Sequence, residues 1–178
     1  MGRTRGVAAL LAFLLPAAAA AVEVRYEGAL LSHYVWRGIT LTDGPVFQPS
    51  VTISHANGLA LEIRGNVDLD DDNDAAGEIS EVLLVLDWAQ RVGKLEIGAG
   101  FVEFLFPNTP FPGTREVYLR FALDALVSPR LELHYDFDEI EGAYARLALA
   151  YERALSPTWR ATLEASAGWA DAEFAIGG

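Results

Sequence analysis

The chain has 178 residues, with 13 Lys and Arg against 25 Asp and Glu, which gives a formal net charge of −12 at pH 7. A strongly acidic chain lacks the basic face that displaces counterions from nucleic acid, which argues against nucleic acid as a partner. Hydrophobic residues still make up 52% of the sequence, too many for a disordered acidic chain. The sequence contains no cysteine, which excludes disulfides and thiol chemistry. Apolar and charged side chains must therefore be separated in space.

Residues 1–21 have the pattern of a secretory signal peptide. Arg3 and Arg5 precede an apolar run over residues 7–15, and a string of alanines ends at Ala21, where cleavage is expected. No later apolar run reaches the roughly 17–25 residues that a membrane-spanning helix needs. The sequence predicts an exported chain whose residues 22–178 form one domain without a helical anchor.

Most of the remaining chain alternates polar and apolar side chains with a period of two. In one such segment, Leu131 and Leu133 alternate with Glu132 and His134. Successive side chains of a β-strand point to opposite faces, so each segment has one apolar and one polar face. The pattern predicts nine strands, at residues 29–37, 46–55, 59–69, 78–88, 94–104, 114–123, 130–137, 143–153 and 159–168.

The lengths and spacing of these strands favour a membrane β-barrel over a soluble β-sandwich. Several are about 10 residues long, enough for a tilted strand to cross a bilayer. Short connections alternate with longer or more acidic ones, as periplasmic turns alternate with outer loops. Aromatic residues gather near strand ends, where interfacial girdles would lie. They are Trp36, Trp88, Phe104, Phe106, Phe137, Tyr151, Trp159 and Trp169. We expect an all-β, antiparallel transmembrane barrel.

Residues 32–49 resemble the opening strand and loop of the TorF-type porins. That family typically begins with a serine, an aromatic pair around an Arg-Gly, and a following Pro and Gln. Tyr34 to Gly38 is the most specific part of the resemblance, which extends from about Leu30 to Asp171. Further similar segments are 58–68, 116–118 and 168–171. The resemblance implies a small outer-membrane barrel, with passage of small solutes as the function inferred for such an architecture.

The predicted strand count is odd, whereas single-chain bacterial outer-membrane barrels have even counts. An open sheet in lipid would leave unpaired backbone groups at both edges, each costing several kcal/mol. The sequence stops at residues 175–178, with no further amphipathic strand and no terminal aromatic residue. We therefore expect a C-terminally incomplete chain and a native barrel of about 10–12 strands.

Charged residues on the polar faces are the candidate functional residues. Inside a small barrel they either pair across strands and fill the lumen, or line a water path and set its ion preference. Arg37 is a candidate constriction charge or a tie to an acidic loop, and Gly38 permits a bulge or close backbone approach. The lumen and constriction candidates are Arg37, Glu62, Arg64, Glu116, Arg120, Arg146, Arg160 and Glu164.

An acidic segment follows the third predicted strand. Asp70, Asp72, Asp74 and Glu81 occupy positions 1, 3, 5 and 12 of a calcium-loop pattern. The turn glycine is replaced by Ala75, however, and the flanks are strands. The main interpretation is a solvated outer loop, and the alternative is a weak Ca²⁺ site that could bridge lipopolysaccharide phosphates.

The chain has three histidines, His33, His55 and His134. Ser32 precedes His33 and Ser54 precedes His55, but neighbours in a strand point to opposite faces, which prevents a direct Ser–His dyad. His134 shares its face with acids and has no serine nearby in sequence. We expect no catalytic residue, no enzyme activity and no cofactor.

Together these features predict a monomeric barrel of the bacterial cell outer membrane, a porin for passive passage of small solutes or ions. The expected partners are outer-membrane lipid, lipopolysaccharide, the barrel-assembly machinery and small solutes. Two alternatives remain open: a non-conducting structural or adhesive barrel, and a secreted soluble β-sandwich that acts as a binding module.

Overall fold

A computed structural model describes residues 22–70 and 76–177, with side chains omitted at 175–177, so the predicted signal peptide lies outside the described residues. The expected all-β antiparallel fold is confirmed. The main sheet has nine strands. In spatial order they are β1 (Val22–Leu31), β4 (Val46–His55), β5 (Leu59–Asp68), β6 (Ile79–Val92), β7 (Leu95–Leu105), β8 (Thr114–Leu123), β9 (Ser128–Asp136), β10 (Ala143–Ala154) and β11 (Arg160–Ala170).

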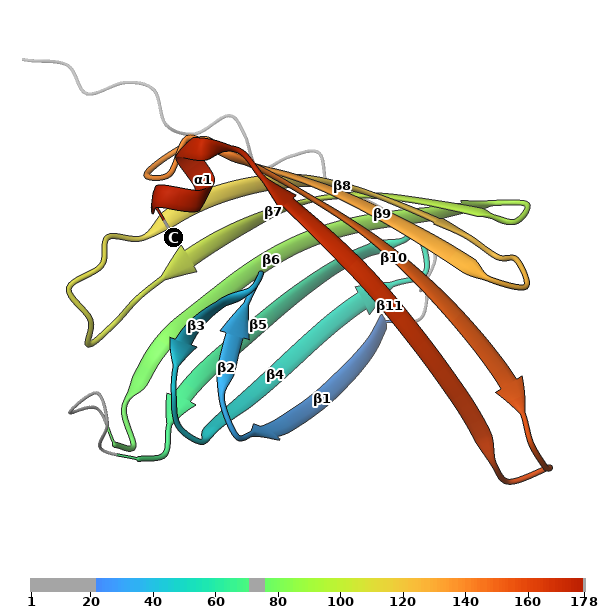
Figure 1. The fold of residues 1–178 in the computed structure, drawn as a ribbon, viewed down its shortest axis with the longest axis horizontal. Helices are drawn as coiled ribbons and strands as arrows, with labels where there is room; N and C mark the ends of the chain where they lie inside the picture. Colours follow the sequence, from blue (N-terminus) through green and yellow to red (C-terminus); the bar gives the residue numbers. More distant parts are fainter. Residues whose placement is uncertain (1–21, 71–75, 178) are drawn as a thin grey trace, which may run out of the picture.

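The sheet curves around a smaller element. A two-stranded hairpin of β2 (Tyr34–Trp36) and β3 (Ile39–Thr42) leaves the connection between β1 and β4 and lies in the hollow of the sheet (Figure 1). A short helix, α1 (Ala172–Gly177), follows β11 at the same end of the sheet as the long connections. Among the described residues, no helix has both the length and the apolar character needed to cross a membrane.

The described sheet is open. Its strand order begins with β1 and ends with β11, and no pairing joins these two edges in the part of the chain that the structure covers. Every neighbouring pair is antiparallel and the count is nine, so β1 and β11 run in the same direction. The structure therefore shows an antiparallel sheet without a closed barrel.

The N-terminal part of the strand prediction is wrong. A single strand was expected at 29–37, but β1 begins at Val22 and ends at Leu31, and a bend separates it from the hairpin. The alternation of Val22, Val24 and Tyr26 with charged residues carries the same period-two signal. That signal was masked because it directly adjoins the alanine-rich signal segment.

Glycines set the tight turns between the paired strands. Arg37 and Gly38 connect the hairpin strands with φ values of 51° and 91°. Positive φ at both central residues defines the type I′ turn that suits a two-residue hairpin. Gly38 thus serves a turn, where the sequence had suggested a bulge or a close approach. Gly93, with φ 63°, opens the two-residue turn between β6 and β7.

The two faces of the sheet differ in polarity. Large apolar side chains on the outer face remain exposed, for example 45% for Leu61, 47% for Leu119 and 40% for Leu133. The inner face buries polar groups instead, with Asn66 and Glu116 each 1% exposed. The inner face therefore carries the buried charges together with a small apolar cluster of Leu83, Val102 and Phe104, while the outer face carries exposed apolar side chains.

A row of residues crosses the inner face from β8 over β7 to β6. Gly100 pairs with Tyr118 on one side and with Asp87 on the other, and the Tyr118 hydroxyl donates a hydrogen bond to the Asp87 carboxylate across the glycine. Gly98 similarly lies under Arg120, whose guanidinium would be 3.1 Å from an added Cβ and which pairs with Asp87 at 3.3 Å. Both glycines permit side chains to lie flat across the central strand.

Replacing Gly100 by alanine should displace the Tyr118 ring, since the added Cβ would overlap it. We expect G100A to lose about 1–3 kcal/mol of unfolding free energy, measured by urea denaturation of detergent-refolded protein with tryptophan fluorescence. The control is G65A on the outer face, where an added Cβ meets Pro49 at an ordinary 3.7 Å. Equal urea midpoints for the two variants would contradict this packing role.

Candidate functional site

The predicted interior charges share the inner face of the sheet. Their positions alternate with the exposed apolar residues in each strand, and residues directly opposite in the antiparallel register face the same way. Arg37 reaches this face from the hairpin. The strand residues placed there are Glu62, Arg64, Glu116, Arg120, Arg146, Arg160 and Glu164. The inner face, not one compact pocket, therefore holds the candidate residues.

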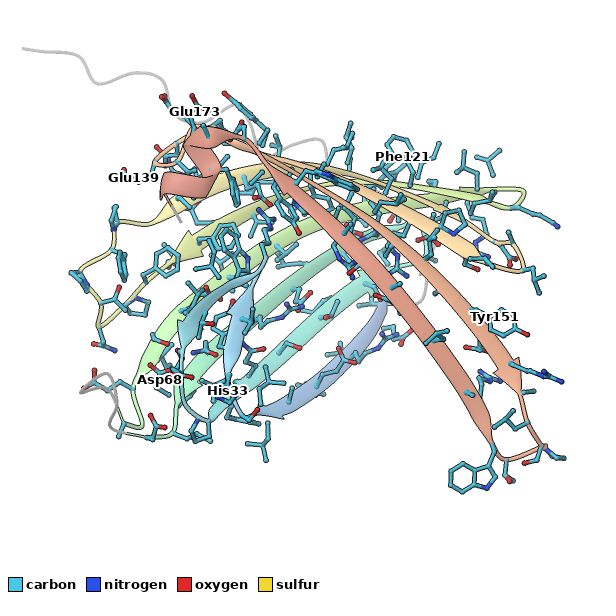
Figure 2. The ribbon with its side chains drawn as sticks, in the orientation of Figure 1. His33, Asp68, Phe121, Glu139, Tyr151 and Glu173 are labelled. Atoms are coloured by element: carbon cyan, nitrogen blue, oxygen red, sulfur yellow. The ribbon has the colours of Figure 1, made fainter. Side chains whose placement is uncertain are left out.

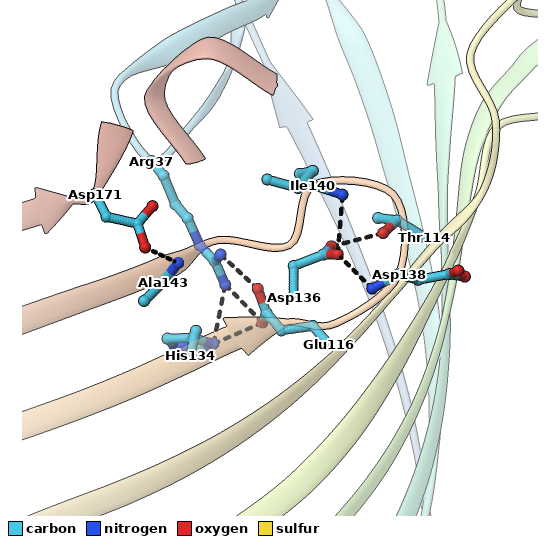
Figure 3. A network of polar contacts seen from close by, with 9 residues as sticks. All are labelled: Arg37, Thr114, Glu116, His134, Asp136, Asp138, Ile140, Ala143 and Asp171. Atoms are coloured by element: carbon cyan, nitrogen blue, oxygen red, sulfur yellow. Dashed lines mark hydrogen bonds and ion pairs between the residues drawn. The ribbon is translucent and has the colours of Figure 1, made fainter. Parts of the chain in front are cut away.

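Arg37 is the centre of the contacts between hairpin and sheet. Its guanidinium donates two hydrogen bonds to Glu116 on β8, at 2.6 and 2.8 Å, and the side chains are 12% and 2% exposed. His134 on β9 brings Nδ1 to 2.7 Å from Glu116 and 2.9 Å from Arg37 (Figure 3). A protonated Nδ1 donates to the carboxylate, so Glu116 accepts from both cationic and imidazole donors.

Three aromatic rings enclose the same guanidinium. Its Cζ lies 4.5 Å from the ring centroid of Trp36, 4.7 Å from Tyr144 and 5.2 Å from Phe174. Phe174 stacks on Trp36 at 5.5 Å and on Tyr144 at 5.6 Å. A desolvated cation gains from such ring faces while the carboxylate neutralises it. We call Arg37, Glu116, His134 and the three rings the Arg37 clamp.

The backbone at Arg37 carries strain that the clamp offsets. A residue with a Cβ at φ 51° is in the left-handed region, which costs roughly 1–2 kcal/mol. Asparagine or glycine would suit this turn position better. The arginine is held there because its side chain, not its backbone, is stabilised. Strain at a non-glycine residue with such partners points to a functional or locking role.

Helix α1 completes the clamp through Phe174, which is 1% exposed. Asp171 accepts from the Phe174 N–H at 2.9 Å, which caps the helix, and from the Ala143 N–H at 2.7 Å. Gly142 provides the necessary room, because an added Cβ would lie 2.6 Å from the Phe174 nitrogen. The C-terminal segment is thereby tied to β10 and to the hairpin.

A second buried carboxylate orders the connection between β9 and β10. Asp136, 1% exposed, accepts from the Thr114 hydroxyl at 2.6 Å and from the N–H groups of Asp138 and Ile140 at 3.1 and 3.2 Å (Figure 3). These bonds hold the 137–142 connection over the end of the sheet.

The other hairpin strand has its own polar anchor. Thr42 on β3 donates to Asp68 at 3.2 Å, and Asp68 also accepts from Asn66 at 3.0 Å and from Ser80 at 3.3 Å. Tyr34 on β2 donates to Glu81 on β6 at 2.9 Å. Burial and the nearby Glu81 carboxylate raise the pKa of the Tyr34 hydroxyl well above its usual value, so it remains a donor.

Nearer the short turns, the interior charges pair with one another. Arg146 bridges Glu132 at 3.5 Å and Glu164 at 2.9 Å. Arg64 pairs with Glu62, a neighbour on its own strand, at 2.7 Å. Arg160 binds Glu152 at 3.1 Å, and the two side chains are 69% and 55% exposed. Sequence periodicity identified the face of these charges but not their partners, because strand register was not known.

Only part of the calcium-loop pattern lies within the described residues. Asp72 and Asp74 lie outside the described residues, and Glu81 points to the inner face, where it accepts from Tyr34. No group of three or more potential ligands for a metal ion is present in the described ranges. The described part of the chain thus gives no support to a calcium loop that includes Glu81.

Ser32 and His33 were expected to lie in a strand and to point to opposite faces, and this expectation is wrong. They lie in a bend and not in a strand, so they do not point apart, and the Ser32 Oγ is 3.0 Å from the His33 Nδ1. Asp43 approaches the His33 Nε2 at 3.3 Å, with side chains 54% and 84% exposed (Figure 2 labels His33). Contacts so open to water contribute little.

Three aromatic residues expected in the interfacial girdle also lie elsewhere. Trp36 packs edge-on against Phe104 at 5.9 Å, and Phe104 stacks with Phe106 at 6.4 Å. Their cluster lies between the hairpin and the inner face, with Phe104 only 4% exposed. Trp88, Phe137, Trp159 and Trp169 remain exposed, as an interfacial position requires.

Replacing Glu116 by glutamine should leave the Arg37 cation buried without its counter-charge. We expect E116Q to lose about 3–5 kcal/mol of unfolding free energy in urea. Trypsin should also cleave after Arg37 in E116Q but spare this bond in the native protein, because the hairpin would leave the hollow.

The matched control is E132Q, which removes a carboxylate from the neighbouring strand on the same face. Its partner Arg146 lies 3.5 Å away and is 28% exposed, so the loss should stay near 1 kcal/mol or below. Similar losses and equal trypsin resistance in both variants would show that Arg37 is not the anchor of the hairpin.

Comparisons with known proteins identify the family of the chain. No curated protein and no solved structure matches the chain. A family model described as "Bacterial protein of unknown function (Gcw_chp)" matches residues 16–173, which span the whole sheet, the hairpin and the start of α1. The chain therefore belongs to the Gcw_chp family of bacterial proteins of unknown function.

Proposed function

We propose that this chain is an outer-membrane β-barrel protein. The observation that carries the proposal is the polarity of the sheet: its apolar outer face stays exposed, while its inner face buries the carboxylates Glu81, Glu116 and Asp136. Phe121 and Tyr151 belong to the outer face (Figure 2). An exposed apolar area this large on a soluble protein would cause aggregation, whereas lipid tails would cover it. The signal peptide expected at residues 1–21 is consistent with export.

A soluble sandwich accounts less well for the arrangement. Its two sheets would bury their apolar faces against each other. In the described ranges the second sheet is the β2–β3 hairpin, and it lies on the polar face of the main sheet. The apolar face thus has no protein layer over it in this part of the chain.

The proposed barrel closes through a further strand that pairs with both the β1 edge and the β11 edge. Both edge strands are exposed along their whole length, and in lipid each unpaired backbone group would cost several kcal/mol. The edges run in the same direction, so a further strand antiparallel to both can close an even-numbered barrel. This is the basis for retaining about 10–12 strands in the proposal.

Small-solute or ion passage is the proposed activity, supported by the charged inner face and by the resemblance to TorF-type porins. The hairpin restricts such a path, because the Arg37 clamp holds it in the hollow. The same observation favours a second candidate, a non-conducting structural barrel. Outer-membrane lipid and lipopolysaccharide remain the proposed surroundings in both cases.

Single-cysteine spin labels test the membrane proposal cleanly because the chain has no cysteine of its own. Labels at L61C and L119C should be reached by oxygen and not by a water-soluble nickel complex after refolding into vesicles, since both positions would face lipid. Label at T52C, opposite Glu62 on the inner face, should show lower oxygen access. Greater nickel than oxygen access at both outer positions would refute lipid contact.

Planar-bilayer recording tests the passage of ions. The native protein should give small conductance steps, and R37A should give larger ones because the hairpin loses its anchor. R91A, whose guanidinium pairs with Glu96 near the opposite end of the sheet, should behave like the native protein. Silence of all three at high protein load would reject the porin activity and favour the structural barrel.

A further inference from the structure

A cleft at the long-connection end of the fold separates the hairpin from the 106–113 connection between β7 and β8. It consists of two adjoining hollows of about 150 and 360 Å³. Both are lined by Leu41 from the hairpin, Glu81 from β6, and Phe106 and Phe111 from the connection. The larger hollow alone reaches the lower limit of small-molecule sites.

Aromatic rings form a continuous wall along this cleft. Trp36 meets Phe104 edge to face at 5.9 Å, Phe104 stacks on Phe106 at 6.4 Å, and Phe106 meets Phe111 edge to face at 6.5 Å. All four rings line the smaller hollow. Phe111 is 68% exposed, so an apolar side chain is held at the mouth without being needed for the core.

Glu81 is the charged group within the wall. It is 4% exposed, and Tyr34 donates to its Oε1 at 2.9 Å. Every fully enclosed side-chain oxygen or nitrogen in the described residues has a hydrogen-bond partner. The Glu81 Oε2 makes no hydrogen bond with the described residues, so it is not fully enclosed. Because Glu81 lines the cleft, a ligand in the cleft can contact this oxygen.

The remaining ionisable lining residues are also acidic. Asp68 accepts hydrogen bonds from Thr42, Asn66 and Ser80 through its Oδ1 alone, and Glu139 is exposed at the rim. Figure 2 shows Asp68 and Glu139 at the same end of the sheet. None of the described side chains that line either hollow is basic. The cleft therefore combines aromatic faces with an acidic lining, and Arg64 acts on Glu81 electrostatically from outside that lining.

We propose that this cleft binds a small organic cation with a compact apolar body, such as a protonated or quaternary amine. Ring faces attract a cation through their quadrupole, and the free oxygen of Glu81 supplies the counter-charge at the inner end. A metal ion fits less well, because the walls are carbon and the described residues offer no cluster of three ligands. A neutral apolar ligand would leave the Glu81 carboxylate desolvated and unpaired. The proposal does not depend on conduction.

Calorimetric titration of the full chain, refolded in detergent, tests the site with choline as probe. Its neutral isostere 3,3-dimethylbutan-1-ol serves as the ligand control. Choline should bind and the alcohol should not. E81Q keeps the size and the acceptor for Tyr34 but removes the charge, and should weaken choline binding about tenfold or more. E164Q makes the same change on the same face outside the cleft, and should bind as the native protein does.

A second variant, F111A, keeps the proposal testable if E81Q fails to fold, because it removes an exposed ring and leaves the buried aromatic residues intact. It should weaken choline binding about threefold to fivefold. Equal affinity for choline and the alcohol would overturn the cationic specificity. Unchanged choline affinity in both E81Q and F111A would show that the binding is elsewhere, and no binding by the folded native protein would reject the site. None of these results depends on conductance, so failure of the binding site can be distinguished from failure of the proposed porin function.

Discussion

The architecture depends on neutralising charge on the inner face of a curved sheet. The outer face carries apolar side chains in every strand, so the polar half of each alternating pattern faces the hollow, where the hairpin buries part of it. There each cation needs a carboxylate, and each carboxylate needs donors. Arg37 and Glu116 satisfy this requirement most completely, with two charge-assisted hydrogen bonds, an imidazole and three rings around one ion pair. Buried pairs of this kind add little net stability but make the loss of either partner expensive.

Polar groups also decide how the hairpin is seated. Its first strand is held at Tyr34 and its second at Thr42, each by a buried acceptor on the main sheet. The Arg37 clamp fixes the turn between them. Three anchors on one short hairpin define its position and orientation, which a two-stranded ribbon could not maintain alone. The cleft beside it therefore has one rigid wall, and its acidic and aromatic lining is held at a fixed separation.

Much of the fold could be read from the sequence because strands have a period of two. Eight of the nine expected segments lie close to strands of the main sheet, and the alternation correctly placed Glu62, Arg120 and Glu164 on one face. The hairpin could not be read in the same way, since strands of three and four residues are too short for a periodic signal. Arg37 was recognised as unusual, but Glu116 lies 79 residues away, so only the folded register could reveal the pair. Helix α1 was missed because it has only six residues; its Asp171 cap is local, but the packing of Phe174 on Trp36 and Tyr144 is tertiary.

The distribution of the clamp along the chain has a consequence for the order of assembly. Arg37 emerges early, but its partners Glu116, His134, Tyr144 and Phe174 come from β8, β9, β10 and α1. Long-range contacts of this kind form late, after the intervening loops have closed. Until the last of these elements docks, the arginine has neither counter-ion nor aromatic cover, and its strained turn is not compensated. The hairpin is thus anchored in two parts: Tyr34 and Thr42 hold it to β6 and β5, whereas its turn is fixed only once β8, β9, β10 and α1 have joined.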